Sequence, residues 1–150
     1  MCCPAGNYLT LPMSQDCLFC QIVAKAIPSH TVYEDDATCA FLDINPVNPG
    51  HTLIIPKEHY PDFSETPDEV VDRVMRTIRK VAPAVLLTTN TQAYHVTINN
   101  GIDAGQVIFH THAHLIPRQP DDGHVLWGGK PIPEEQLSAI ADTIKKSIQP

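Results

Sequence analysis

The segment TPDEVVDRVMRTIRKVAPAVLL, residues 66–87, has the periodicity of one long amphipathic helix, and this helix constrains the fold more than any other feature. Thr66 is expected to cap it, with Pro67 in the first helical position and Glu69 completing a capping box. Pro83 is expected to bend or loosen the last turns. The predicted buried stripe consists of Val70, Val74, Ile78, Val81 and Val85. The partners of this stripe must come from the shorter segments on either side.

Most of these shorter segments have the composition of strands. Strands are expected at 30–35, 38–44, 51–56, 93–99 and 106–117, with a hairpin turn at Asp35-Asp36 and a Pro-rich loop at 45–50. Two further helices are expected: one over 16–25, which Asp16 caps and Pro28 ends, and an amphipathic one over 133–148. This order predicts an α+β fold, in which a five-stranded antiparallel sheet is combined with a short N-terminal helix, the long helix and a C-terminal helix.

The composition is that of a globular protein, with 43% hydrophobic and 18% charged residues in a chain of 150. We expect one domain over residues 15–150, preceded by a flexible leader at 1–14. No apolar run approaches the ~18 residues of a membrane helix, and a net charge of −7 argues against non-specific nucleic-acid binding. The N-terminus does not resemble a signal peptide, so a cytoplasmic location is expected, in which the five cysteines stay reduced.

Three histidines alternate in the sequence HTHAH, residues 110–114. If this segment is a strand, His110, His112 and His114 share one face, while Ala113 and Leu115 point to the core. A plain polar face rarely holds three imidazoles, and histidine is the side chain that titrates near neutral pH. The row therefore indicates either a metal site or a nucleophile with an acid beside it.

A second group of possible ligands begins with the pair CLFC, in which Cys17 and Cys20 have a spacing common in zinc sites. Such a pair can equally be two buried thiols on a helix. A zinc site needs two more ligands, and His59 and His110 are the first candidates. The other histidines, at positions 30, 51, 95 and 124, remain open alternatives.

Taken together, CLFCQIV, VYEDD, AFLDINPVNPGHTLIIPKEHY and GQVIFHTHAHLIPR resemble the histidine triad (HIT) superfamily of nucleotide-binding proteins, from about Asp16 to Arg118. The resemblance is greatest to the bacterial and archaeal members of the Hint branch. It implies that His112 attacks the α-phosphorus of a purine nucleotide and forms a nucleotidyl-histidine, from which water releases a nucleoside monophosphate. It also implies that His114 contacts the phosphate or the leaving group and helps to protonate it.

The resemblance assigns further roles. Asn99, Gly105 and Gln106 hold phosphate oxygens, and Asp43 accepts hydrogen bonds from the ribose. The residues implied for the purine pocket are Phe19, Ile22, Phe41, Ile44 and Leu53. Val107 belongs to the same nucleotide-binding set, at a position where many animal Hint proteins carry a serine that touches the phosphate or leaving group.

The zinc-bearing members of the family have ligands that match Cys17, Cys20, His59 and His110, which implies a structural zinc ion. The family is typically homodimeric, with two five-stranded sheets joined into one. The segment after Arg118 lies outside the strong resemblance, and it is the part of the chain expected to reach toward the partner's pocket.

Several functions remain open at this point. The first is a nucleotide hydrolase or transferase acting on an AMP- or GMP-type substrate. The alternatives are a Fhit-like dinucleoside polyphosphate hydrolase, a zinc-dependent hydrolase with metal-activated water, and a non-catalytic nucleotide-binding scaffold.

Overall fold

The computed structural model describes residues 16–124 and 128–148, so the predicted leader at 1–14 lies outside the described residues. The regular elements follow the predicted order. They are α1 (Leu18–Val23), β1 (Thr31–Glu34), β2 (Thr38–Leu42), β3 (Thr52–Pro56), α2 (Asp68–Thr89), β4 (Ala93–Thr97), the 3₁₀ turn η1 (Ile102–Ala104), β5 (Ala113–Arg118) and α3 (Glu134–Ser147). The predicted α+β fold is therefore confirmed.

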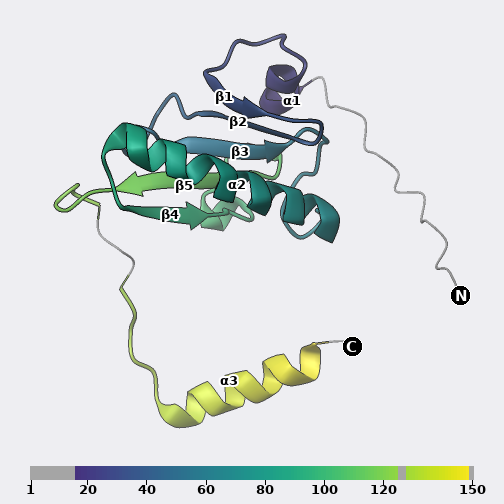
Figure 1. Ribbon diagram of the computed structural model, residues 1–150. Helices are drawn as coiled ribbons and strands as arrows, with labels where there is room; N and C mark the ends of the chain where they lie inside the picture. The colour runs from purple at the N-terminus through teal and green to yellow at the C-terminus, as the bar shows by residue number, and fades with distance from the viewer. Residues whose placement is uncertain (1–15, 125–127, 149–150) are drawn as a thin grey trace, which may run out of the picture.

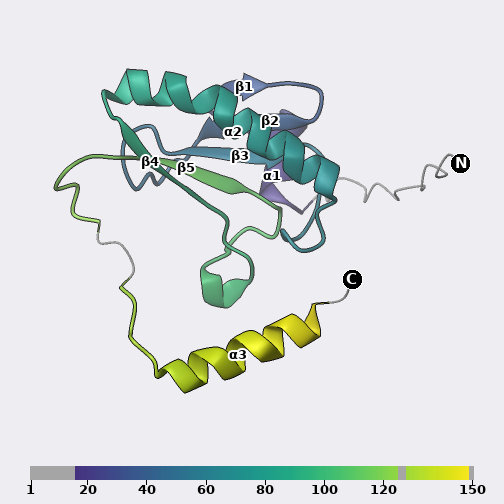
Figure 2. The same cartoon turned by 60° about the horizontal axis from the view of Figure 1, so that its bottom comes forward.

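The strands form one antiparallel five-stranded sheet in the order β1-β2-β3-β5-β4. Figure 1 shows α2 lying across one face of this sheet, and Figure 2 shows α2 above the strands with α1 on the other side. The first two strands form the predicted hairpin. Asp35 sets its turn, because its carboxylate accepts hydrogen bonds from the backbone N–H groups of Ala37 and Thr38 at 2.9 and 2.7 Å.

The face under α2 contains the larger core. The helix contributes Val74, Ile78, Val81, Ala82 and Val85, and the strands contribute Ala40, Ile54, Ala113 and Leu115. The predicted stripe is thus confirmed, except that Val70 is only half-buried. The helix continues through Pro83 to Thr89.

The predicted cap of α2 is wrong. The helix begins at Asp68, and Pro67 occupies the N-cap position with an extended backbone, so Thr66 lies outside the first turn and makes no capping bond. Its hydroxyl instead donates to the backbone oxygen of Asp62 at 2.8 Å and lies 2.7 Å from the hydroxyl of Thr111. Thr66 therefore ties the entrance of α2 to the histidine segment.

The opposite face of the sheet carries α1. Phe19 and Ile22 of this helix pack against side chains of β2 and β3. Cys17, not the predicted Asp16, occupies the N-cap position, and no side chain caps the helix. A short helix that starts at a cysteine pair thus covers the face to which Phe41 and Leu53 point.

The last strand is shorter than predicted, since β5 begins at Ala113 and not near 106. Ahead of it the backbone turns, because the N–H of His110 bonds to the oxygen of Ile108 at 2.9 Å and that of Thr111 to Tyr60 at 2.7 Å. Ala113 and Leu115 do point into the core, as predicted. The three histidines, however, do not lie in one row on a strand.

The helix α3 stands away from the sheet in both views, and none of its residues is buried. Among the helices that the structure describes, none combines the length and the apolar content required to cross a membrane.

Gly50, in the loop between β2 and β3, gives a direct test of this packing. Its φ is +87°, and an added Cβ would lie 2.5 Å from Cγ2 of Thr89 at the end of α2. We expect Gly50→Ala to lower the free energy of unfolding by about 1–3 kcal/mol, measured by urea denaturation. Gly123→Ala is the matched control, because Gly123 has a φ of +79° but its added Cβ would have no neighbour within 4 Å among the described residues. Equal losses in the two variants would rule out the close contact as the cause.

Candidate functional site

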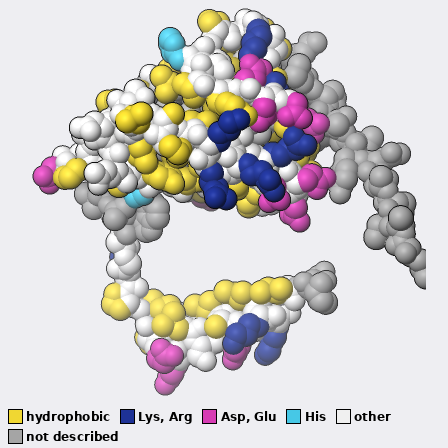
Figure 3. Space-filling model, viewed as in Figure 1, with side chains coloured by type: hydrophobic (Ala, Val, Ile, Leu, Met, Phe, Trp, Pro, Cys, Tyr) yellow, Lys and Arg dark blue, Asp and Glu magenta, His cyan; other side chains and the backbone are white. Residues whose placement is uncertain are grey.

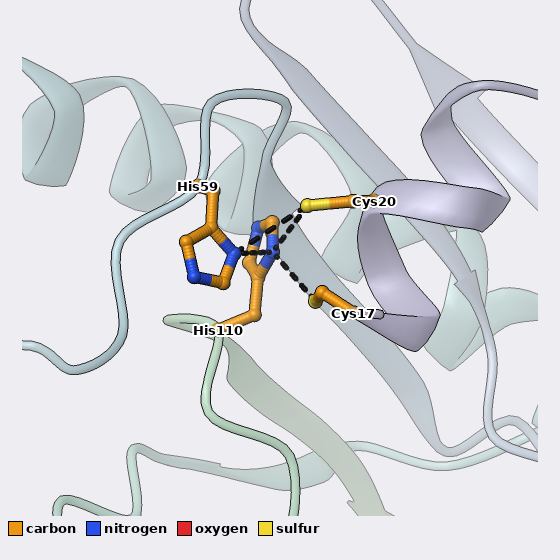
Figure 4. Close-up of side chains that lie close together, drawn as sticks. All are labelled: Cys17, Cys20, His59 and His110. Atoms are coloured by element: carbon orange, nitrogen blue, oxygen red, sulfur yellow. Dashed lines mark hydrogen bonds between the residues drawn. The ribbon is translucent and has the colours of Figure 1, made fainter. Parts of the chain in front are cut away.

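Two groups of side chains meet near the start of β5, and His110 belongs to the first of them. Its imidazole points toward α1 and the loop after β3, where it meets Cys17, Cys20 and His59 (Figure 4). The Nδ1 atom of His110 lies 3.5 Å from Sγ of Cys17, 3.6 Å from Sγ of Cys20 and 3.3 Å from Nδ1 of His59. The Sγ atom of Cys20 lies 3.4 Å from the same His59 nitrogen.

These distances fit the edges of a zinc tetrahedron. Sulfur and nitrogen ligands bound at about 2.3 and 2.05 Å lie roughly 3.5 Å apart at tetrahedral angles, and two nitrogens roughly 3.3 Å apart. The tautomer of His110 also fits, because its Nε2–H donates to the backbone oxygen of Pro56 at 2.9 Å and leaves the Nδ1 lone pair facing the sulfurs. The four residues therefore suit a structural zinc ion, with all four ligand positions supplied by protein.

The second group lines a cavity of about 420 Å³, a size within the usual range of about 300–1,000 Å³ for small-molecule sites. It lies on the α1 face of the sheet. Its lining residues are Leu18, Phe19, Ile22, Ile27, Pro28, Ser29, Phe41, Leu42, Asp43, Ile44, Asn45, Leu53, Gly105, Val107, Ile108, His112 and His114. The cavity is thus mostly apolar, with a carboxylate and two imidazoles among its polar groups.

The backbone oxygen of His110, a residue of the first group, fixes the orientation of His112. Its Nδ1–H donates to the backbone oxygen of His110 at 2.7 Å, and Phe19 meets its ring edge-to-face, with centroids 5.2 Å apart. A neutral imidazole carries one N–H, so Nε2 of His112 keeps its lone pair. Nε2 of His112, a residue that lines the cavity, therefore carries no proton.

His114 has the opposite tautomer, and His51 sets it. The backbone N–H of Val47 donates to Nδ1 of His51 at 3.2 Å, so the proton of His51 is on Nε2. That Nε2–H donates to Nδ1 of His114 at 2.9 Å, which leaves the proton of His114 on its own Nε2. This Nε2 is buried and has no hydrogen-bond partner among the described residues. A buried N–H without a partner can donate a hydrogen bond to an acceptor atom of a ligand.

The predicted nucleotide-binding residues do not all lie in the cavity. Eight of them line it: Phe19, Ile22, Phe41, Asp43, Ile44, Leu53, Gly105 and Val107. The two amide side chains do not. The Gln106 side chain is buried and bonded to Gly101, Pro61 and Ile108, and the Nδ2 of Asn99 donates to the backbone oxygen of Gly105 at 3.4 Å. These two amides hold the loop that carries Gly105, and their predicted phosphate contacts remain untested.

Sequence reasoning named His51 only as an open alternative for the zinc site and missed its contact with His114. It lies one residue before β3, and the register pairs Leu53 with His114, so His51 stands diagonally across from His114 on the same face of the sheet. Only the pairing of β3 with β5 shows this neighbour, because the two histidines are 63 positions apart in the chain.

Burial lowers the pKa of His114 to about 4, and the neighbouring His112 and His51 act in the same direction. Burial also lowers the pKa of His51. In the unfolded chain both imidazoles titrate near 6.5. Below that pH the unfolded chain binds more protons than the folded protein, so the stabilisation from the neutral imidazoles is complete above pH 6.5 and is lost toward pH 4.

We therefore expect the free energy of unfolding to decrease as the pH falls from about 6.5 to about 4, by about 3 kcal/mol through His114. Urea denaturation of the zinc-loaded protein at several values across this pH range measures how the free energy of unfolding depends on pH. His114→Gln is the comparison, since it removes the titrating group and leaves every other acid-sensitive site in place. Identical slopes for the two proteins would show that His114 is not buried in its neutral form.

The HIT domain family matches residues 24–121. Adenylylsulfatase HINT3 of Arabidopsis thaliana is 41% identical over 132 residues, which are 88% of this chain and only 66% of that relative's length. Adenosine 5'-monophosphoramidase hnt1 of Schizosaccharomyces pombe is 36% identical over 136 residues, covering 89% of this chain and 98% of the relative.

Solved structures show the same fold. The crystal structure of SMU.412c from Streptococcus mutans has a TM-score of 0.87 at 37% identity and covers 99% of this chain and 100% of its own, so the aligned part includes α3. A Zn-bound histidine triad family protein from Mycobacterium smegmatis has a TM-score of 0.70 at 33% identity, covering 88% and 98%. The match to the HIT domain over most of its length, together with these structures, shows that the chain belongs to the histidine triad (HIT) family.

Proposed function

We propose that this protein cleaves a nucleoside monophosphate from a substituent on its α-phosphate, through a nucleotidyl-histidine intermediate. One observation carries the proposal: two neighbouring imidazoles line the same cavity with opposite tautomers. His112 offers a lone pair and His114 offers an N–H, with ring centroids 5.0 Å apart. A nucleophile beside a hydrogen-bond donor is the arrangement that displacement at phosphorus requires.

The steps follow from these two nitrogens. The Nε2 of His112 forms a bond to the α-phosphorus, and the bond from phosphorus to the leaving group breaks. The Nε2–H of His114 hydrogen-bonds to the oxygen or nitrogen on which negative charge develops. Water then attacks the phosphorus and loses a proton to the solvent, the bond from phosphorus to Nε2 of His112 breaks with its electron pair returning to the imidazole, and the nucleoside monophosphate is released. His51 acts as a positioning residue, because its hydrogen bond fixes the tautomer of His114.

The rest of the cavity suits a nucleoside. Phe19, Phe41 and Leu53 offer an apolar slot for a purine ring. Asp43 lines the same cavity and supplies a carboxylate that can accept hydrogen bonds from ribose hydroxyls. Val107 is 81% exposed at the rim and has no hydroxyl to offer a leaving group. The buried Nε2–H of His114 is the donor we assign to that group.

The protonation state of His114 also favours one class of substrate. With a pKa near 4 it is neutral at pH 7, so it can donate a hydrogen bond but has no second proton to give away. A strongly basic leaving group, such as an amine, needs a full proton, whereas sulfate leaves as a stable anion. We therefore favour a mixed anhydride, such as adenylyl sulfate, over an adenosine phosphoramidate as the better substrate.

We further propose that the cluster of Cys17, Cys20, His59 and His110 binds a structural zinc ion. Four protein ligands leave no open position for a reacting water, which argues against the zinc-dependent hydrolase. Asp43, His51 and His114 form a second group of possible ligands. In that group, however, Nε2 of His51 and Nδ1 of His114 lie 2.9 Å apart and share a hydrogen bond. This distance is shorter than the distance between two nitrogen ligands of one zinc ion.

A homodimer is the assembly we propose. The strand β4 is an edge strand, and an edge strand can pair with a strand of another chain. Its side chains Tyr94 and Val96 are 42% and 37% exposed. They lie on the same face of the sheet as α2, which covers the more central strands. A second copy that pairs through β4 would cover them and join the two sheets. The cytoplasmic location stays a prediction from the sequence.

The test of the chemistry is a panel of AMP- and GMP-linked sulfates, amides and dinucleoside polyphosphates, with product release measured by chromatography. We expect nucleoside monophosphate from the sulfate at a higher kcat/KM than from the amide. Faster turnover of the dinucleoside polyphosphates would favour the Fhit-like alternative. Tight binding of AMP without turnover of any compound would favour the scaffold and contradict the proposal.

A further inference from the structure

The loop between β2 and β3, residues 43–51, decides the tautomer on which the proposed donor depends. The backbone N–H of Val47 donates to Nδ1 of His51, which keeps the proton of His51 on Nε2 and directs it to His114. The carboxylate of Asp43 competes for the same nitrogen, because its Oδ2 lies 3.7 Å from Nδ1 of His51. This carboxylate would stabilise a proton on Nδ1, so the position of the Val47 backbone selects between two tautomers of His51.

The selected tautomer reaches the cavity through one hydrogen bond. A proton on Nδ1 of His51 would leave its Nε2 able only to accept, and Nδ1 of His114 would then have to donate. The Nε2 of His114 would carry a lone pair in place of its N–H. The cavity would thus lose the donor assigned to the leaving group, although its shape would stay the same.

Two side chains from the segment after β5 hold this loop. The carboxylate of Asp122 accepts a hydrogen bond from Nδ2 of Asn48 at 2.9 Å, and the same Nδ2 donates to the backbone oxygen of Pro117 at 2.8 Å. The Nε2–H of His124 donates to the backbone oxygen of Val47 at 3.1 Å. The loop is therefore tied to residues that lie 69 to 77 positions later in the chain.

Asp122 is the centre of these contacts, because both of its oxygens accept several hydrogen bonds. Its Oδ1 accepts from Nη2 of Arg118 at 2.8 Å and from the backbone N–H of His124 at 3.0 Å. Its Oδ2 accepts from Nε of Arg118 at 2.5 Å, from Asn48 and, at 3.3 Å, from the backbone N–H of Gln119. The Arg118 guanidinium and these further donors hold the pKa of Asp122 below its usual range, so the side chain is a carboxylate at neutral pH.

The pair of Arg118 and Asp122 lies apart from the main charged surface. Figure 3 shows the charged side chains of the visible face gathered over the N-terminal half of α2, whereas this pair lies where β5 ends and the chain continues toward α3. The two side chains are only 17% and 7% exposed. A bidentate pair with so little exposure is weakly screened by salt and has a defined geometry, so it can hold a loop in one position.

We propose that Asp122 is a positioning residue for His114. It holds the loop between β2 and β3, the loop sets the tautomer of His51, and His51 keeps the proton of His114 on Nε2. Asp122 does not line the cavity, so it acts only through these contacts. The inference rests on the proposed function, since the donor on His114 has a use only in that chemistry.

The test is Asp122→Asn, which keeps the shape of the side chain but turns an NH₂ group toward donors that need an acceptor. Asp121→Asn is the matched control. It makes the same change one residue earlier, on an exposed side chain, and asparagine tolerates the φ of +59° at this position. Asn48→Ala is a second test variant, because it releases the loop and leaves the pair of Arg118 and Asp122 in place.

The first measurement is the nitrogen NMR spectrum of each zinc-loaded protein at neutral pH, with histidine labelled by heavy nitrogen and no substrate present. Protonated and unprotonated imidazole nitrogens resonate far apart, and the spectrum of His114→Gln identifies the signals of His114. In the parent and in Asp121→Asn we expect the proton of His114 on Nε2. In Asp122→Asn and Asn48→Ala we expect a large share of it on Nδ1.

The second measurement is the rate of AMP release from adenylyl sulfate. We expect kcat of Asp122→Asn and Asn48→Ala to fall by about 10- to 100-fold with KM nearly unchanged, because a donor to the leaving group acts mainly in the transition state. Asp121→Asn should keep the parental kcat.

Parental tautomers in Asp122→Asn and Asn48→Ala would overturn the proposal even if their rates fell, because structural damage alone can lower a rate. A changed tautomer with a parental rate would support the link from Asp122 to His114 and would contradict the donor role of His114 in the proposed function. The spectra need no substrate, so they test the link even if the protein turns over no compound of the panel.

Discussion

Replacing His112 by asparagine will lower kcat/KM for AMP release by at least about 1,000-fold, because no other side chain in the cavity offers an unprotonated nitrogen aimed in the same way. The asparagine amide can still donate to the backbone oxygen of His110, so the variant should fold as the parent does. Initial rates with adenylyl sulfate, under conditions where the parent shows clear turnover, measure the loss.

His30→Asn is the matched control for this variant, since His30 is exposed and lies outside the cavity. It should keep the parental rate. Acid quenching of the parent during turnover should trap the nucleotide on a peptide that contains residue 112, and the His112→Asn variant should trap none. If the variant and the parent turn over alike, the nucleophile is a different group and the proposed mechanism is wrong.

The elements of this fold were predictable because their signals are local. The stripe of α2 and the hairpin turn at Asp35-Asp36 each depend on neighbours a few residues away, and both are confirmed except for the half-buried Val70. Their ends were less predictable. The cap of α2 depends on whether Pro67 is helical or extended, and its extended backbone moves the start of the helix to Asp68.

The histidine segment shows where local patterns stop being sufficient. Alternation places three histidines on one face only if the whole segment is extended, but the backbone turns at His110. The turn directs His110 to Cys17 and Cys20, more than 80 positions earlier in the chain. Long-range contacts of this kind, like that of His51 with His114, are set by tertiary structure. The resemblance to a family supplied the ligand set, whereas spacing alone had left the third and fourth ligands open.

The largest effect on stability should come from the cysteine pair. We expect the double variant Cys17→Ala, Cys20→Ala to lose its zinc and to unfold at a lower urea concentration. The loss of free energy should be about 4 kcal/mol where free zinc stands at 1,000 times its dissociation constant, since binding to the folded state alone supplies that amount. Elemental analysis should find about one zinc per chain in the parent and almost none in the variant.

Cys39→Ala is the control for the double variant, because Cys39 is a buried cysteine that lies on β2, outside the cluster. It should keep its zinc. The backbone oxygen of His110 holds His112, so loss of the metal should lower activity in parallel with loss of structure. A chelator that stops turnover while the protein remains folded would instead indicate a zinc ion that takes part in the chemistry. Less than about half an equivalent of zinc in metal-replete parent protein would contradict the four-ligand site.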